Sequence, residues 1–217
     1  MFTGIVEEIG NISAVKRGKS AMQLSIRCTT VLTDVHIGDS ISVNGVCLTV
    51  AQFSDSHFSA DVMPETYKAT NLHTLRIGSP VNLERAMAAN GRFGGHFVSG
   101  HVDGTGEITA VKPLENAIYF NIKMEPTLLK YLIPKGSVTV DGTSLTVFDV
   151  SDHGFTISLI PVTQDDSIVG RKQVGDFVNI ECDMLSKYIE RLLTTDKVNP
   201  ASGGISMETL AANGFLN

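Results

Sequence analysis

Short runs in which hydrophobic and polar residues alternate recur along most of the chain, and many of the hydrophobic members are β-branched. These runs lie at residues 23–26, 40–43, 47–50, 119–122, 137–140 and 155–158. Asn44-Gly45 and Asp141-Gly142 each separate two such runs, and this arrangement is a strong indication of a β-hairpin. The pattern therefore predicts an all-β protein of short strands.

One stretch of this pattern occurs twice. ISVNGVCLTV at residues 41–50 matches VTVDGTSLTV at residues 138–147, 97 positions later, and the register still holds between residues 81–84 and 178–181. Near the beginning of the chain the offset is 96. A period of this length is that of a whole small domain. We expect a tandem duplication of two small closed barrels, each of about six strands, because closure removes exposed edge strands.

The remaining segments divide the chain around these halves. Residues 86–95 are small and rich in glycine, which indicates a linker. We therefore expect an N-terminal barrel at 1–97, a C-terminal barrel at 98–185, and a helix with a tail at 186–217.

Four segments have helical signals. Residues 65–70 continue from Met63-Pro64, and residues 126–132 begin with a proline at the first turn. Apolar residues at positions 184, 185, 188, 189, 192 and 193 form one face of an amphipathic helix. We expect this face to meet the same helix of other subunits, and the alternative is that it folds back on its own barrel. A last helix is expected at residues 206–213, capped by Gly214.

Composition excludes several classes of function. The chain has 23 Asp plus Glu against 17 Lys plus Arg and no long basic run, so nucleic acid is a poor candidate partner. The first residues lack the pattern of a leader, and no stretch is long enough to cross a bilayer. Three cysteines without a C-x-x-C pair are typical of a reducing cytoplasm. The spacing of His, Cys and acidic residues predicts no metal site, and no glycine motif indicates a nucleotide cofactor.

The repeated hairpin carries the main candidates for chemistry. Cys47 and Thr49 are two residues apart and face the same side of a strand, as do Ser144 and Thr146 in the second copy. A polar face in water would explain a single copy. A residue that can act as a nucleophile at the same place in both copies favours a site that faces a ligand.

The places where the copies differ are also informative. They are Ile5 against His101, Gly38 against Lys135, Cys47 against Ser144, and Ala86 against Asp183. His101 is the main candidate for acid–base chemistry near pH 7. The other histidines are interpreted as structural, except His96, which stands between a functional and a structural interpretation. Lys135 could anchor an anionic or carbonyl-rich ligand or be an ordinary turn lysine, and Asp183 could pair with it.

Four motifs together resemble the riboflavin synthase family of the alpha-subunit type. They are MFTGIV at residues 1–6, NGVCLTV at 44–50, GHFVSGHV at 95–102 and DGTSLTV at 141–147. The resemblance covers about residues 1–195. It implies two six-stranded Greek-key barrels and a C-terminal helix, assembled as a homotrimer that uses no cofactor or metal.

The resemblance also implies a reaction. Two molecules of 6,7-dimethyl-8-ribityllumazine undergo a dismutation in which one donates a four-carbon unit to the other. The products are riboflavin and 5-amino-6-(D-ribitylamino)uracil. Each barrel would supply one pocket, and the site would form between the N-terminal barrel of one subunit and the C-terminal barrel of its neighbour. Association with lumazine synthase is left open.

The family's site residues carry over onto both barrels. The substrate-binding set implied in the first barrel is Thr3, Gly4, Ile5, Val6, Cys47, Leu48, Thr49, Asp61, Val62, Met63, Pro64, Glu65 and Thr66. The set in the second barrel is Gly100, His101, Val102, Lys135, Ser144, Leu145, Thr146, Leu159, Ile160, Pro161, Val162, Thr163 and Gln164.

The expected catalytic roles follow from the same resemblance. We expect His101 to transfer the proton, while Ser144 and Thr146 polarise one lumazine and Cys47 and Thr49 the other. The remaining expected members of the catalytic set are Phe2, which closes the site with Thr3, and Asp183.

Two other functions remain open from the sequence. One is a lumazine antenna protein without catalysis, although such proteins tend to lose the polar residues of one barrel, and both barrels keep them here. The other is a structural double-barrel module, which leaves the polar pairs unexplained. One departure from the family is Val162, the counterpart of Glu65 in the second copy, at a position where family members often carry a polar residue.

Overall fold

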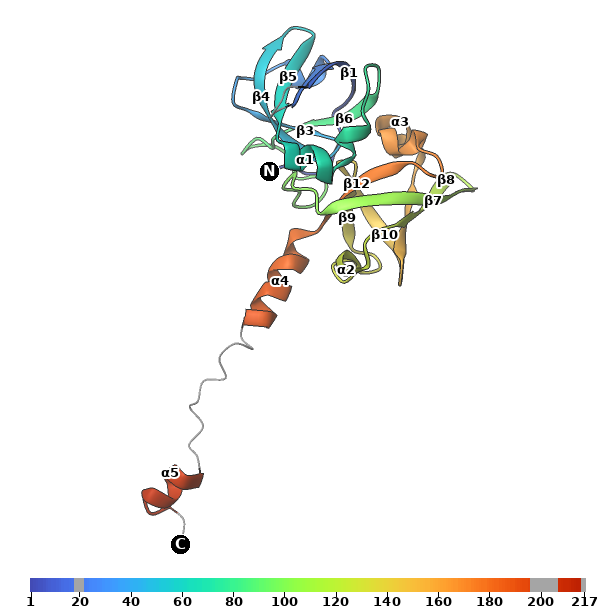
Figure 1. The fold of residues 1–217 in the computed structure, drawn as a ribbon. Coiled ribbons are helices and arrows are strands. Elements are labelled where there is room, and N and C mark those ends of the chain that lie inside the picture. Colours follow the sequence, from blue (N-terminus) through green and yellow to red (C-terminus); the bar gives the residue numbers. More distant parts are fainter. Residues whose placement is uncertain (18–21, 196–206, 216–217) are drawn as a thin grey trace. The chain divides into compact units, whose positions relative to one another are not determined.

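The computed structural model describes residues 1–17, 22–195 and 207–215. The chain forms two compact units, Met1–Met184 and Leu185–Asn217. The first unit contains two closed barrels that follow one another along the chain, coloured blue to green and green to orange in Figure 1.

The first barrel consists of six antiparallel strands. They are β1 (Glu8–Arg17), β2 (Met22–Arg27), β3 (Ser40–Val43), β4 (Val46–Ser54), β5 (His57–Val62) and β6 (Pro80–Arg85). Around the barrel the order is β1-β2-β5-β4-β3-β6, and β6 pairs with β1 to close the sheet. Because β2 pairs with β5 across the intervening hairpin, the connection is a Greek key.

The second barrel repeats this topology. Its strands are β7 (Gly104–Leu114), β8 (Ala117–Lys123), β9 (Ser137–Val140), β10 (Thr143–Ser151), β11 (Gly154–Leu159) and β12 (Phe177–Cys182). Their order is β7-β8-β11-β10-β9-β12, again closed. The predicted duplication and the six-stranded Greek-key barrels are confirmed. The predicted domain limits of 1–97, 98–185 and 186–217 stay a prediction.

Short helices fill the connections of both barrels. They are η1 (Thr30–Leu32), α1 (Pro64–Ala69), η2 (Asn71–Thr74), α2 (Pro126–Leu129), α3 (Pro161–Asp166) and η3 (Ile168–Arg171). The sequence predicted α1 and α2, although α2 ends three residues earlier than expected. It missed α3, which occupies the place of α1 in the second copy and also begins with proline. The residues of α3 have no apolar helical period, so the signals for this helix were its first proline and the repeat.

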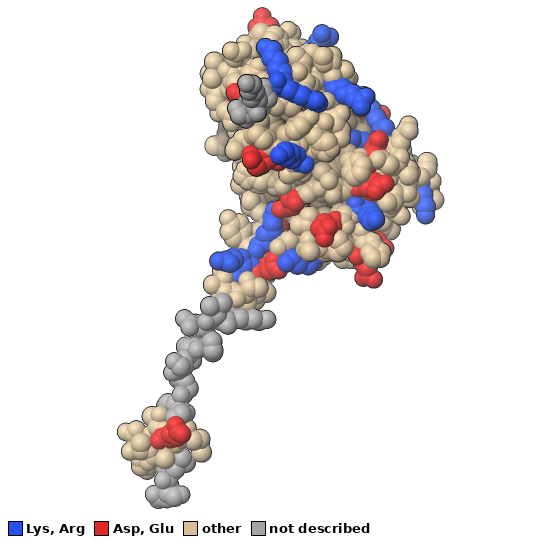
Figure 2. Space-filling view, in the orientation of Figure 1, with Lys and Arg blue, Asp and Glu red and all other residues tan. Residues whose placement is uncertain are grey.

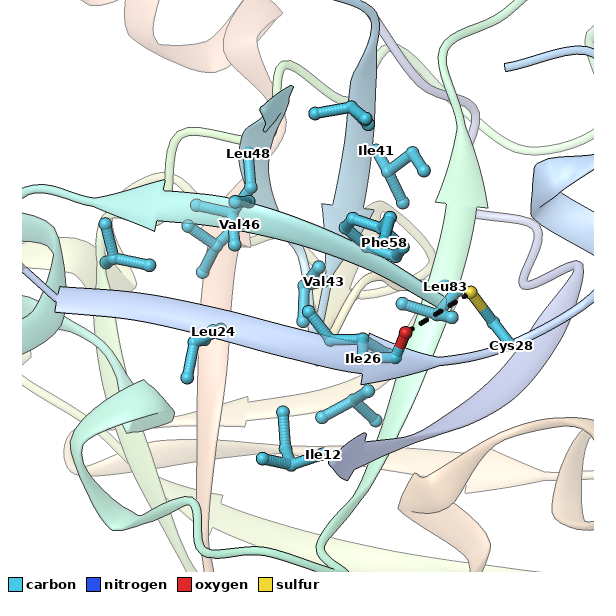
Figure 3. Packing of buried hydrophobic residues seen from close by; sticks show 14 of the residues in the cluster. Ile12, Leu24, Ile26, Cys28, Ile41, Val43, Val46, Leu48, Phe58 and Leu83 are labelled. Atoms are coloured by element: carbon cyan, nitrogen blue, oxygen red, sulfur yellow. Dashed lines mark hydrogen bonds between the residues drawn. The ribbon is translucent and has the colours of Figure 1, made fainter. Parts of the chain in front are cut away.

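Each barrel is filled by its own hydrophobic side chains. In the first barrel every second residue of a strand points inward, and Leu24, Ile26, Ile41, Val43 and Phe58 are fully buried (Figure 3). Burying one such side chain contributes about 1.5–3 kcal/mol to stability. A barrel packed in this way leaves no room for a ligand inside, so any binding surface has to lie on the outer wall.

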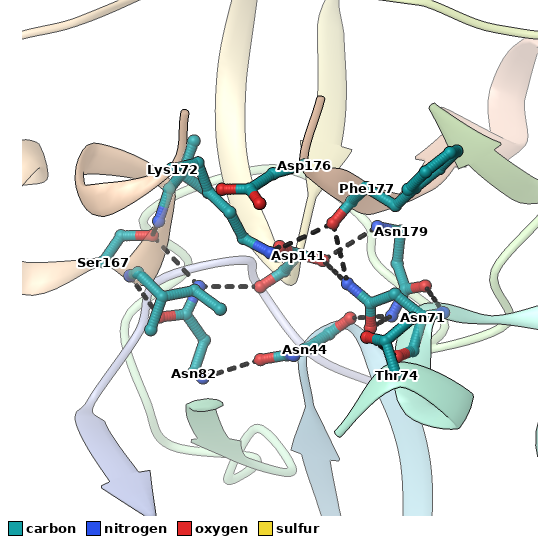
Figure 4. Close-up of polar contacts among 12 residues, drawn as sticks. Asn44, Asn71, Thr74, Asn82, Asp141, Ser167, Lys172, Asp176, Phe177 and Asn179 are labelled. Atoms are coloured by element: carbon teal, nitrogen blue, oxygen red, sulfur yellow. Dashed lines mark hydrogen bonds and ion pairs between the residues drawn. The ribbon is translucent and has the colours of Figure 1, made fainter. Parts of the chain in front are cut away.

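Polar side chains at the turns join the two barrels (Figure 4). The Nδ2 of Asn82 donates to the Asp141 carbonyl, and the Nδ2 of Asn179 donates to the Asn44 carbonyl, both at 2.8 Å. Within each barrel, the backbone N–H of Asn82 or Asn179 donates to the side chain of Asn44 or Asp141, also at 2.8 Å. Asn82 and Asn179 are equivalent residues of the two copies, and each makes to the other barrel the contact that its counterpart makes in return.

The two hairpin turns meet at the centre of this contact. A Cβ on Gly45 would lie 2.8 Å from the Gly142 nitrogen, and one on Gly142 would lie 2.7 Å from the Gly45 nitrogen. Both glycines also have positive φ, at 81° and 79°. Glycine is therefore required twice, for the turn conformation and for the approach of the backbones.

One ion pair breaks the symmetry of the contact. The fully buried Asp141 lies 3.5 Å from the Lys172 ammonium, while the matching residues of the first copy are Asn44 and Leu75. Burial raises the pKa of Asp141 above its ordinary value, and the Lys172 charge and hydrogen bonds from Asn179 and Asn71 oppose that rise. Only the second copy therefore has a charged group in this contact.

The described part of the second unit contains two helices. Its helices are α4 (Met184–Thr195), which begins at the last residue of the first unit, and α5 (Met207–Ala212), followed by Gly214 with φ of 76°. Both predicted helices and the glycine cap are confirmed. The first residue of the second predicted helix, residue 206, and the predicted tail from about residue 199 up to that helix lie outside the described residues. Within the described ranges, none of the helices has the length and hydrophobicity needed to cross a membrane.

We predict that the Asp141–Lys172 pair can be replaced by its neutral counterpart. Lys172→Leu alone strands a buried carboxylate and should lower the free energy of unfolding by about 3–5 kcal/mol. The double variant with Asp141→Asn restores the chemistry of the first copy, so it should recover most of that loss in urea unfolding at pH 7. A double variant as unstable as Lys172→Leu would contradict this account.

The pH dependence gives a second readout of the same pair. The pKa of Asp141 is raised in the folded state from an ordinary 3.8, so the folded state favours the protonated carboxyl. The contribution of Asp141 to the free energy of unfolding is therefore fully present below pH 3.8, and it is lost as the pH rises through the raised pKa of the folded state. Lys172→Leu should show this loss more strongly than the parent protein, and the double variant should not show it.

Candidate ligand-binding site

The repeated polar pairs lie on the outer walls of the barrels. Thr49 on β4 and Thr146 on β10 are exposed, and Cys47 and Ser144 are half-buried. The residues between them, Leu48 and Leu145, belong to the barrel cores. Strand alternation therefore turns the polar pairs away from the core and toward the outside of the barrel.

A segment before each barrel crosses to the wall of the other barrel. The Ser144 N–H donates to the Gly4 carbonyl at 2.7 Å, and the Cys47 N–H donates to the Gly100 carbonyl at 2.8 Å. Phe2 and Val98 exchange backbone hydrogen bonds between the two segments. The segments thus connect the barrels at the polar pairs.

Two buried glutamates hold these segments in place. Glu84 at the end of β6 accepts hydrogen bonds from the backbone N–H groups of Thr3 and Gly4 and from the Thr3 hydroxyl, at 2.7–3.0 Å. Glu181 on β12 does the same for Ser99 and Gly100, at 2.7–2.9 Å. Burial raises the pKa of Glu84. Neither glutamate was predicted, although the repeat placed both at matching positions.

The crossing corrects the predicted grouping of residues. Gly4 was assigned to the first barrel and Gly100 to the second, but their carbonyls contact the opposite walls. Val102 packs against the core of the first barrel. The candidate site therefore has two composite corners, one with Cys47 and the segment at 100–102, and one with Ser144 and the segment at 3–5.

His96 is the titratable side chain held against the second corner. Its Nδ1 lies 2.7 Å from the Ser144 hydroxyl and its Nε2 lies 3.2 Å from the Thr139 hydroxyl. Burial lowers the pKa of His96, and the nearby Asp183 carboxylate opposes that effect. The sequence ranked His96 below His101 because nothing in its spacing shows that the chain folds back onto Ser144.

The other predicted residues fall into three groups. The buried ones are Phe2, Thr3, Gly4, Leu48, Val62, Gly100, Leu145 and Leu159. The half-buried ones are Val6, Cys47, Thr66, Val102, Ser144, Thr163, Gln164 and Asp183. The exposed ones are Ile5, Thr49, Asp61, Met63, Pro64, Glu65, His101, Lys135, Thr146, Ile160, Pro161 and Val162.

These locations limit how each residue could act. Side chains in the barrel cores, such as Val62 and Leu159, could contact a ligand only through their backbone. Phe2 has no exposed surface and packs in the contact between the segments. The ring of His101 is exposed and, among the described residues, has no hydrogen-bond partner, so it is available to a ligand.

Lys135 adopts an unusual backbone conformation. Its φ is 67°, in the left-handed region that favours glycine, and the matching Gly38 has φ of 96°. Both backbone N–H groups close the same turn by donating to Val147 and Val50. A lysine in this place costs stability that glycine would not cost, which favours a role for its side chain.

The surface of the first unit is hollowed beside the linker, and charged side chains line part of this hollow. A cavity of about 610 Å³ beside the linker is lined in part by Thr3, Ile5, Arg85, Met87 and Arg92. Figure 2 shows acidic and basic side chains interspersed over the visible face of the first unit. Over the described ranges, no three His, Cys, Asp or Glu side chains are grouped so as to hold a metal ion.

Known proteins are similar to this chain in sequence and in fold. The model of the lumazine binding domain matches residues 3–86 and 99–183. The chain is 56% identical to riboflavin synthase of Bacillus subtilis (strain 168), covering 99% of this chain and 100% of that protein. It is 52% identical to riboflavin synthase of Actinobacillus pleuropneumoniae, with the same coverage.

Solved structures show the same architecture. LumP complexed with riboflavin superposes with a TM-score of 0.78 at 23% identity, covering 84% of this chain and 99% of that chain. LumP complexed with 6,7-dimethyl-8-(1'-D-ribityl) lumazine has a TM-score of 0.75 at 24% identity and covers 83% and 98%. At this identity the likeness establishes the fold.

We predict that exchanging the turn residues has opposite effects in the two copies. Lys135→Gly relieves the strained φ and should raise the free energy of unfolding by roughly 1 kcal/mol. Gly38→Lys should lower it by a similar amount, since a Cβ there meets nothing within 4 Å and only the backbone is affected. Urea unfolding of both variants measures the effect, and a destabilised Lys135→Gly would contradict it.

Proposed function

This chain belongs to the riboflavin synthase family, and from that premise we propose that it forms riboflavin by dismutation of two 6,7-dimethyl-8-ribityllumazine molecules. The second product is 5-amino-6-(D-ribitylamino)uracil. The observation that carries the proposal is the pair of equivalent outer walls, each with a polar pair at the same place. Two like walls suit two copies of one substrate, and the differences between the walls suit their different roles.

The chemistry begins at the methyl group on C7 of one lumazine. Loss of a proton gives a carbanion, which attacks the second lumazine after that molecule is activated at C7. The adduct then splits by two eliminations, and a four-carbon unit passes from one molecule to the other. Both reactants are flat and must meet face to face, so holding them in position removes much of the entropic barrier.

The exposed groups of the two corners support distinct roles. His101 has an accessible ring and is proposed to transfer the proton, and Lys135, which is exposed on its turn, is proposed to present a cation to the ligand. Thr49 and Thr146 point outward from matching strands and are proposed to polarise the two lumazines. Phe2 and Thr3 are proposed to act through the packing of the N-terminal segment, since both are buried.

We also propose that the site is completed by a neighbouring subunit of a homotrimer. The polar walls are open on the outside of the barrels, and a lumazine bound there would remain in water without a cover. Five apolar side chains of α4 have more than half of their surface exposed: Leu185, Tyr188, Ile189, Leu192 and Leu193. Trimerisation through α4 would cover these residues and bring unlike barrels of two subunits together.

The cellular context is part of the same proposal. The three thiols form no disulfide, which is compatible with a cytoplasmic enzyme. Lumazine synthase produces the substrate, so association with that enzyme is proposed as well. A lumazine antenna protein is the alternative function, and it has the same fold but would bind lumazine without converting it.

The direct test is to mix the pure protein with the lumazine and follow riboflavin absorbance. We expect conversion without any added cofactor, and His101→Gln should lower kcat by about 100-fold, the usual range for a general acid or base. His153→Gln serves as a matched control on an exposed turn of the second barrel. Binding without conversion would favour the antenna function.

The role of α4 is tested by charge on its apolar face. Leu185→Asp with Leu192→Asp should give a monomer in sedimentation velocity and should abolish most of the turnover, because a subunit site would lack its cover. Ser186→Asp with Thr194→Asp adds the same charge on the polar face and should leave both properties intact. A fully active monomer would refute the shared site.

A further inference from the structure

We propose that His96 is a positioning residue that turns the Ser144 hydroxyl into a hydrogen-bond donor toward the ligand. The inference rests on the proposed function, which places a lumazine against this wall. It goes further by assigning a direction to one hydrogen bond. The hydroxyl would then polarise an acceptor atom of the ligand and would serve neither as base nor as nucleophile.

The first step concerns the contact between His96 and Thr139. Thr139 lies on β9 with 1% of its surface exposed, and its Oγ1 lies 3.2 Å from His96 Nε2. Among the described residues, this nitrogen is the hydrogen-bond partner of the Thr139 hydroxyl. A buried hydroxyl that cannot donate its proton loses free energy. Thr139 therefore donates to Nε2, which has to be the unprotonated nitrogen of the ring.

The second step follows from the chemistry of neutral imidazole. A neutral ring has one donor and one acceptor, so an unprotonated Nε2 places the proton on Nδ1. Nδ1 then donates to Ser144 Oγ across 2.7 Å. The proton of the Ser144 hydroxyl is left to point elsewhere. The Ser144 backbone N–H already donates to the Gly4 carbonyl, so the hydroxyl is the donor that this residue can offer to a ligand.

The third step explains how the ring is held. The N–H of His96 donates to the Thr3 carbonyl at 3.1 Å. A Cβ on the preceding Gly95 would collide with that carbonyl and would lie 3.0 Å from Ser144 Oγ. The chain can therefore run directly against Ser144 only because residue 95 is glycine. The ring is buried, and burial favours its neutral form.

The corner at Cys47 lacks an equivalent contact with an imidazole among the described residues. Cys47 stands where Ser144 does, and among the residues that the structure describes no histidine lies within hydrogen-bond distance of its thiol. A thiol is also a weak donor compared with a hydroxyl. The Ser144 corner can therefore polarise a ligand more strongly, which would distinguish the two otherwise similar lumazines.

The test compares two replacements of His96 that place an amide at different positions of the ring, with His96→Leu as the replacement that has no amide. Asn places an N–H near the position of Nδ1, whereas Gln places its amide near Nε2. His96→Asn should keep turnover within about threefold of the parent, and His96→Gln and His96→Leu should lose at least about tenfold, as when a donor to a reacting group is removed. Ser144→Ala should match His96→Leu, and the double variant should be no worse, because both changes remove one hydrogen bond.

Binding and spectroscopy keep this test separate from that of the proposed function. Lumazine fluorescence titration should show the same order of affinities among the variants, whether or not the parent converts the ligand. Nitrogen NMR of the imidazole should show the neutral Nδ1–H tautomer in the parent. Equal losses in His96→Asn and His96→Leu, additive losses in the double variant, or an Nε2–H tautomer would each overturn the inference. A parent that neither binds nor converts lumazine would overturn both proposals.

Discussion

The hydrogen bonds between the turns of the two barrels are the contact on which the rest of the first unit depends. A closed barrel has no free strand edge, so two barrels cannot join by extending a sheet. Here Asn82 and Asn179 reach across the contact to carbonyls at residues 141 and 44. Buried amides that satisfy one another in this way hold a single orientation, because any shift leaves polar groups unpaired.

That orientation determines where the candidate site lies. With the turns in contact, the segment at residues 3–5 reaches the wall of the second barrel, and the segment at 100–102 reaches the wall of the first. Glu84 and Glu181 then fix both segments through buried hydrogen bonds. Each polar pair is thus completed by chain that comes before the barrel of the other copy.

The duplication makes the outer walls of the two barrels similar, and a few side chains make them different. Gly38 and Cys47 in the first copy correspond to Lys135 and Ser144 in the second. In the part of the chain that the structure describes, an imidazole lies against Ser144 but not against Cys47. Lys135 keeps the left-handed conformation of its glycine counterpart at some cost. Changes of this kind leave the cores intact, so the two outer walls can diverge in chemistry while the fold stays the same.

The sequence by itself determined the local structure and its repetition. Alternating residues, the turns at Asn44-Gly45 and Asp141-Gly142, and the period of 97 predicted two six-stranded barrels, because strand period and turn conformation are local properties of the chain. The same alternation indicated that Cys47 and Ser144 face away from the cores. The helix of α4 was also predicted from its apolar face.

Only the tertiary structure decided which distant residues meet. The contacts of Gly4 with Ser144, of Gly100 with Cys47, and of His96 with Ser144 join residues that have no regular spacing along the chain. The crossing of the two segments corrected the assignment of Gly4 and Gly100 to barrels, and it made His96 a candidate. Such contacts arise from the packing of one barrel on the other, and no local pattern of residues encodes that packing.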